Sequence, residues 1–216
     1  MSNETVTVKK SNRKSSITLM TELAFLTAII FIMAFTPLGY LRVGIVQITF
    51  IVVPVAVGAV LLGVKAGAFL GLMFGLSSLL QPESLAMVSI IPVQVIVTCI
   101  VPRIFVGIVP ALVYKGLGKL SKKTAIKHTV NTAISCVLAP LTNTVLYVGF
   151  FVAVLGQYMA KTNPDIWGVL AGKSFFAGFG IFFGLVAVNA VVEAISCLFI
   201  ATAICNALWH TVNKSN

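Results

Sequence analysis

The chain has 216 residues, of which 59% are hydrophobic and only 9% are charged, yet its formal net charge is +10. Apolar runs as long as these exclude an ordinary soluble domain of this size. A basic excess can also indicate nucleic-acid binding, but here the lysines directly flank hydrophobic runs, so sorting of charge across a membrane explains them better.

The hydrophobic runs predict an all-α integral membrane protein with six transmembrane helices. The second and third runs are short for a bilayer, which needs about 20 helical residues, and only residues 63–65 separate them, so a tight helical hairpin is expected. The last two runs are longer than needed and must tilt or project. The predicted spans are residues 17–35, 49–62, 66–80, 102–119, 125–155 and 174–209.

One membrane domain accounts for nearly the whole chain. Residues 1–15 are expected to form a basic cytoplasmic tail, residues 16–210 the six-helix domain, and residues 211–216 a cytoplasmic C-terminal tail. The first apolar run is about 19 residues long and lacks a small-residue cleavage site, so we interpret it as a retained helix rather than a signal peptide.

Six spans place both termini on the same side of the membrane, and the basic residues indicate which side. With the termini in the cytoplasm, eleven Lys or Arg residues lie inside against three outside, namely Arg42, Lys161 and Lys173. Short cytoplasmic loops carry such an excess. The prediction is therefore an N-in, C-in topology in a prokaryotic plasma membrane.

Motifs for catalysis, metal binding or nucleotide binding are not evident. The four cysteines, Cys99, Cys136, Cys197 and Cys205, lie in apolar runs without C-x-x-C spacing, which favours buried small residues over a disulfide or metal site. There is no P-loop, so we expect neither enzyme activity nor a cofactor, and energy for any transport must come from other chains.

Polar residues from three predicted helices fall at one depth. At about 1.5 Å per residue, Arg103 and Asn143 lie about 24 Å above the cytoplasmic ends of their helices, and Glu193 and Asn189 lie about 25 and 31 Å above theirs. Asn189 and Glu193 share a helical face at a spacing of four residues, as do Asn143 and Tyr147. Ionisable groups within spans are functional candidates because their burial in lipid is expensive.

Two interpretations of this cluster remain open. One is a solute pocket open to the outside, covered by the outer loops 37–47 and 81–94, which contribute Tyr40 and Gln94. The other is a structural ion pair between Arg103 and Glu193 with asparagines as interhelical contacts. An intramembrane enzyme with Glu193 as its base lacks a second catalytic group. A stand-alone secondary transporter would need inverted repeats, which are not evident.

Over nearly its whole length the chain resembles the substrate-binding S components of energy-coupling factor (ECF) vitamin transporters. The resemblance rests on six short-looped spans, a basic N-terminus and the spacing Ala24-x-x-x-Ala28 in the first span. It also rests on residues 36–40 (TPLGY), 51–59 (IVVPVAVGA) and 62–68 (LGVKAGA), on Pro102-Arg103 and on Asn189.

The resemblance implies a vitamin-binding subunit that joins a transmembrane coupling subunit and two cytoplasmic ATPase subunits. Ala24 and Ala28 would then form the surface that docks on the coupling subunit, since small residues permit close helix approach. Pantothenate is the vitamin we expect, because Arg103 with the amide and carboxyl side chains suits a small anionic solute better than a flat aromatic one. Pyridoxine, hydroxymethylpyrimidine, riboflavin and cobalamin are the alternatives.

Overall fold

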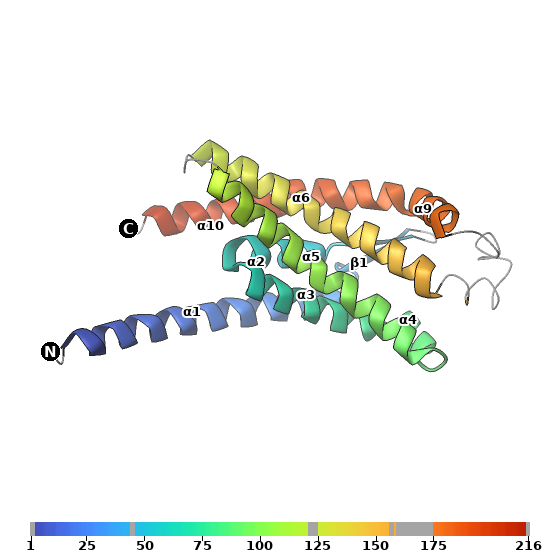
Figure 1. Cartoon of the computed structure of the whole chain (residues 1–216), viewed down its shortest axis with the longest axis horizontal. Helices are drawn as coiled ribbons and strands as arrows, with labels where there is room; N and C mark the ends of the chain where they lie inside the picture. Colours follow the sequence, from blue (N-terminus) through green and yellow to red (C-terminus); the bar gives the residue numbers. More distant parts are fainter. Residues whose placement is uncertain (1–2, 44–45, 121–124, 156–157, 159–174, 215–216) are drawn as a thin grey trace.

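The hydrophobic runs of the sequence fold into long helices that lie side by side, as a computed structural model shows (Figure 1). The structure describes residues 3–43, 46–120, 125–155, 158 and 175–214. Both termini lie at the same end of the bundle, and α5 ends and α6 begins at that end too.

The described elements follow one another as helices with a single strand pair near the start. In chain order they are α1 (Asn3–Ala34), β1 (Tyr40–Val43), β2 (Val46–Thr49), α2 (Val52–Leu62), α3 (Val64–Leu79), α4 (Pro82–Val88), α5 (Pro92–Leu120), α6 (Ala125–Phe150), the π-helical turn η1 (Phe151–Leu155), α9 (Phe175–Ser196), the π-helical turn η3 (Cys197–Ala201) and α10 (Thr202–Lys214).

The prediction of a mostly helical membrane protein is confirmed. Four described segments are long and apolar enough to cross a bilayer: Ser16–Ala34, Pro92–Lys119, His128–Val154 and Val186–Leu208. A fifth is counted if α3 and α4, which meet at a 77° bend, form one broken span. The remaining apolar helix, α2, has only 11 residues.

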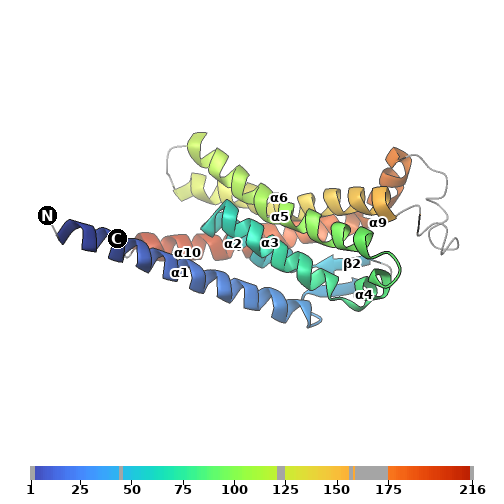
Figure 2. The same cartoon turned by 60° about the horizontal axis from the view of Figure 1, so that its bottom comes forward.

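The connections predicted to face outside contain more regular secondary structure than the sequence patterns indicated. Residues 81–94 were expected to form a loop, but they contain α4 and the start of α5, which begins at Pro92 rather than at the predicted residue 102. Residues 40–43 and 46–47 belong to the antiparallel strands β1 and β2 (Figure 2), in which Tyr40 lies opposite Thr49. The basic residues before the first span are part of α1, which begins at Asn3, so the predicted tail is helical from that residue on.

Helices α3 and α5 pack with their backbones in contact, because glycine recurs every fourth residue along α3. Gly67 lies against the backbone of Gly107, and Gly71 lies against the backbone carbonyl of Arg103. A Cβ atom at Gly71 would overlap that carbonyl group. Small residues at this spacing let helices approach closely in membranes, and here the approach fixes the part of α5 that carries Arg103.

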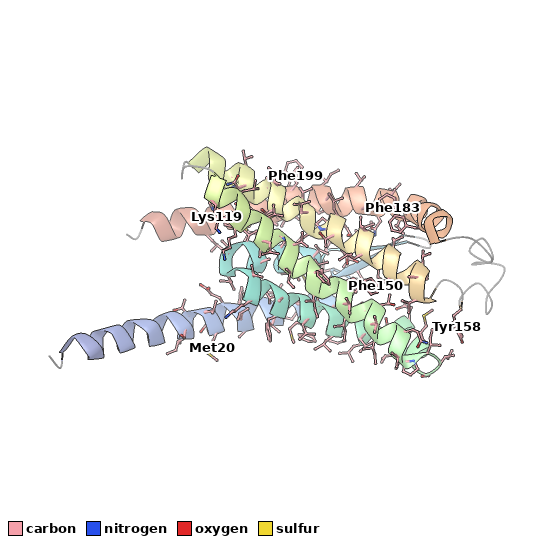
Figure 3. The ribbon with its side chains drawn as sticks, in the orientation of Figure 1. Met20, Lys119, Phe150, Tyr158, Phe183 and Phe199 are labelled. Atoms are coloured by element: carbon pink, nitrogen blue, oxygen red, sulfur yellow. The ribbon has the colours of Figure 1, made fainter. Side chains whose placement is uncertain are left out.

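Two apolar clusters fill the interior. The larger contains most of α2 with Leu70, Phe74 and Val106, and Tyr40 packs at its edge. The smaller contains Val95, Cys99, Val148, Phe151 and Val152, and Tyr147 packs at its edge. Labelled side chains orient these regions in Figure 3: Lys119 lies toward the end with the termini, and Phe183 and Tyr158 lie toward the opposite end.

A glycine substitution tests the close contact of α3 with α5. Gly71→Ala is expected to destabilise the protein by about 1–3 kcal/mol, because the new methyl group must displace the Arg103 carbonyl. Gly116→Ala is the matched control, since no atom lies within 4 Å of a Cβ placed there. Thermal melting of both purified variants decides the matter, and equal melting temperatures would contradict the packing argument.

Candidate functional site

Polar side chains from α5, α6 and α9 are buried together inside the helical bundle. Arg103 on α5 and Asn143 on α6 are each 8% exposed, and Glu193 on α9 is 2% exposed. These side chains belong to three separate helices, so the bundle itself brings the groups together. Burial of this kind is rare for charged residues unless they are paired or functional.

A proline creates the acceptor that holds Arg103. In a regular helix the N–H of residue 102 would donate to the carbonyl of residue 98, but Pro102 has no N–H. The Thr98 carbonyl instead accepts a hydrogen bond from Nη1 of Arg103 at 2.9 Å. The pair Pro102-Arg103 therefore fixes the guanidinium group from within its own helix.

Two aromatic rings enclose the same guanidinium group. The Cζ atom of Arg103 lies 4.4 Å from the ring centroid of Tyr147 and 5.6 Å from that of Phe74. A cation over the face of an aromatic ring is stabilised electrostatically, more strongly where water is excluded. The rings come from α6 and α3, so three helices hold the Arg103 side chain.

The carboxyl group of Glu193 is held by a different set of donors. Its Oε1 accepts hydrogen bonds from the backbone N–H of Thr49 at 2.7 Å and from Nδ2 of Asn189 at 3.2 Å. Asn143 and Arg103 lie near enough to interact with the carboxyl group electrostatically. The contacts of the described residues include no direct salt bridge between Arg103 and Glu193.

Several buried polar atoms of this cluster have no hydrogen-bond partner among the described residues. Among them are Nε of Arg103, Oδ1 of Asn143 and Oε2 of Glu193. Leaving a buried donor or acceptor unpaired costs about 1–3 kcal/mol. One cationic donor and two acceptors from three helices form a site able to bind a solute with an anionic group and with hydroxyl or amide hydrogens.

The structure brings most of the predicted site residues together. Tyr40 lies near Arg103 and near Ser77 and Ser78 on α3, and Asn189 donates a hydrogen bond to Glu193 as described above. Gln94 differs, because its side chain is exposed near the start of α5, one turn before Thr98. Ala24 and Ala28 are exposed on α1.

Sequence reasoning missed three of the contacts that hold these side chains in place. Thr49 acts through a backbone N–H, and Thr98 acts through a carbonyl, so neither side chain signals its role. Phe74 resembles any other apolar residue of a span. The glycine spacing of α3, by contrast, is visible in the sequence as a repeat of small residues that predicts close helix packing.

These features define a multi-pass membrane protein with a cluster of buried polar side chains inside its helical bundle. The family model described as "ECF transporter, substrate-specific component" matches residues 18–205. The chain therefore belongs to the family of substrate-specific components of ECF transporters. It is a substrate-binding transport subunit of the prokaryotic cell membrane rather than an enzyme.

Two curated relatives match most of the chain. A protein of Leuconostoc mesenteroides subsp. mesenteroides named "Pantothenate transporter PanT" is 31% identical over 204 residues, which cover 92% of this chain and 94% of the relative. A protein of Lactococcus lactis subsp. cremoris named "Pantothenic acid transporter PanT" is 28% identical over 184 residues, which cover 79% of this chain and 82% of the relative.

A double-mutant cycle tests whether Pro102 provides the acceptor for Arg103. Arg103→Ala leaves the Thr98 carbonyl without a donor, but in a Pro102→Ala background the alanine N–H supplies one. The loss of stability caused by Arg103→Ala should therefore shrink by about 1 kcal/mol in that background.

The second internal proline of α5 gives the control for this cycle. Pro110→Ala also restores a helical N–H, but it does not change the donors near Thr98. Its effect should simply add to that of Arg103→Ala. Unfolding free energies of the single and double variants measure both couplings, and additivity in the Pro102 cycle would contradict the assignment.

Proposed function

We propose that this chain binds pantothenate on the outer side of the membrane for an ATP-driven importer. The observation that carries the proposal is the buried Arg103 guanidinium beside the unpaired oxygen atoms of Asn143 and Glu193. Pantothenate has a carboxylate at one end and an amide and two hydroxyl groups along its length. Both curated relatives carry pantothenate in their names.

The chemistry of each group suggests how the solute is oriented. The guanidinium of Arg103, already enclosed by Tyr147 and Phe74, receives the carboxylate, because Arg pairs with carboxylates through directed N–H donors. Oδ1 of Asn143 and Oε2 of Glu193 accept hydrogens from the hydroxyl and amide groups. Tyr40 completes the proposed site from β1.

We further propose six membrane crossings with both termini in the cytoplasm. In support, both termini lie at one end of the bundle, and Lys119 lies toward that end (Figures 1 and 3). Lys65 and Lys115 are exposed, as expected for residues in contact with water or lipid head groups. Lys122, Lys123, Lys161 and Lys173 lie outside the described residues.

The proposed partners are a transmembrane coupling subunit and two cytoplasmic ATPase subunits. The coupling subunit docks on the exposed face of α1 around Ala24 and Ala28. Ile17 and Phe35 lie on that face and are 57% and 63% exposed. Large apolar residues on either side of a small-residue surface form a shallow site for another helix.

The binding proposal is tested with a pair of ligands that differ at one group. Pantothenol carries a hydroxymethyl group where pantothenate has its carboxylate. Arg103→Ala should weaken pantothenate binding by roughly tenfold or more, the effect of losing a charged hydrogen bond, but should change pantothenol binding little. Arg103→Lys should restore only part of the preference, because a point charge does not reproduce the guanidinium geometry.

Titration calorimetry of both ligands, with thermal melting of each unliganded variant, separates binding from folding. If Arg103 serves only the fold, its removal lowers stability by roughly 3–5 kcal/mol and affects both ligands alike. Equal losses for pantothenate and pantothenol would therefore contradict the carboxylate assignment.

Docking is tested by filling the small-residue surface. Ala24→Leu with Ala28→Leu should reduce ATP-dependent uptake to background while leaving pantothenate affinity nearly unchanged, because the leucines keep the partner helix away. Leu112→Trp is the control, a large side chain at an exposed position on α5. Normal uptake by the leucine variant in vesicles would remove these alanines from the interface.

A further inference from the structure

The strand pair between α1 and α2 is joined to α9 through a single carboxyl group. Tyr40 of β1 lies opposite Thr49 of β2, and the next pair is closed by a hydrogen bond from the Phe50 N–H to the Gly39 carbonyl at 3.0 Å. Because the N–H groups of an antiparallel strand alternate in direction, the Thr49 N–H points away from β1. It donates to Oε1 of Glu193 at 2.7 Å.

This contact is strong by the usual criteria for hydrogen bonds. It is short, its acceptor is ionisable, and Glu193 is almost fully shielded from solvent. Two strands of four residues are marginally stable on their own and need attachment to the rest of a fold. On the opposite strand Tyr40 faces α3, so the hairpin is held between α3 and α9.

The two oxygen atoms of Glu193 have different surroundings. Oε1 accepts from Thr49 and from Asn189, whereas Oε2 has no hydrogen-bond partner among the described residues. A side chain that served only the solute would keep both oxygen atoms available to it, but here the backbone N–H of Thr49 occupies Oε1.

We infer that Glu193 is a positioning residue, whose Oε1 fixes the hairpin strands β1 (Tyr40–Val43) and β2 (Val46–Thr49) on the bundle while Oε2 faces the solute site. The role of Oε2 rests on the proposed function, but the role of Oε1 does not. The hairpin carries Tyr40, which packs against the main apolar cluster and lies near Arg103. Fixing the hairpin therefore also fixes one wall of the site, and solute affinity depends on the Thr49 N–H.

Hydrogen exchange in the unliganded protein tests the Oε1 role without any ligand. Thr49→Pro removes the N–H that donates to Glu193. Proline is tolerated at this strand position, because the lost N–H does not pair with the partner strand. Exchange of the remaining amides of residues 40–50 should become roughly tenfold faster or more. Glu193→Ala should have the same effect, whereas Glu193→Gln should stay near wild type, because its amide oxygen still accepts.

Two control variants isolate the N–H group. Thr49→Ala keeps the N–H and loses only the side chain. Gln47→Pro places a proline at the other N–H of β2 that faces away from β1, by the same alternation. Both should exchange like wild type, and unchanged protection of α5 amides in every variant shows that the bundle is folded.

The outcomes separate this inference from the proposed function. Unchanged hairpin exchange in both Thr49→Pro and Glu193→Ala overturns the inference, whatever the protein binds. If both variants exchange faster but the wild-type protein does not bind pantothenate, the proposed function is overturned and the hairpin attachment stands. Where both hold, Thr49→Pro should also weaken pantothenate binding, and Thr49→Ala should not.

Discussion

Ionisable groups inside an apolar bundle must be satisfied by the protein itself, because lipid offers them no hydrogen bonds. Arg103 and Glu193 meet this requirement separately. A carbonyl freed by Pro102 and two aromatic rings hold the cation, and a strand N–H with Asn189 holds the carboxylate. The two side chains are thus kept near each other with no direct salt bridge among the described contacts, and polar atoms of both have no hydrogen-bond partner there.

The glycines of α3 make this arrangement possible. Without side chains at Gly67 and Gly71, α3 and α5 approach until their backbones touch, and the contact falls on the Arg103 carbonyl itself. Close packing leaves little room for rearrangement, so the cation is presented from a rigid support. The hairpin, in contrast, depends on a few polar contacts. The polar cluster is therefore bounded on one side by the rigid pair α3 and α5 and on another by the separately attached hairpin.

Much of the site could be predicted from the sequence, because helical rise fixes depth regardless of packing. Counting from the predicted cytoplasmic ends placed Arg103, Asn143 and Glu193 at one level, and the structure brings them together. The predicted start of α5 was wrong. Prolines favour the first turn of a helix, so Pro102 was assigned to that turn, whereas the helix begins at Pro92. The hairpin was missed, since its attachment uses the backbone N–H of Thr49, which no side-chain pattern records.

The central claim is that the polar cluster selects a small anionic vitamin over flat or bulky ones. Thermal stabilisation of the purified wild-type protein by each candidate vitamin tests it most directly, because a ligand raises stability in proportion to the logarithm of its concentration over its dissociation constant. The account predicts stabilisation by pantothenate and none by pyridoxine, hydroxymethylpyrimidine, riboflavin or cobalamin at equal concentration. Stabilisation by one of these four, with no effect of pantothenate, would contradict it.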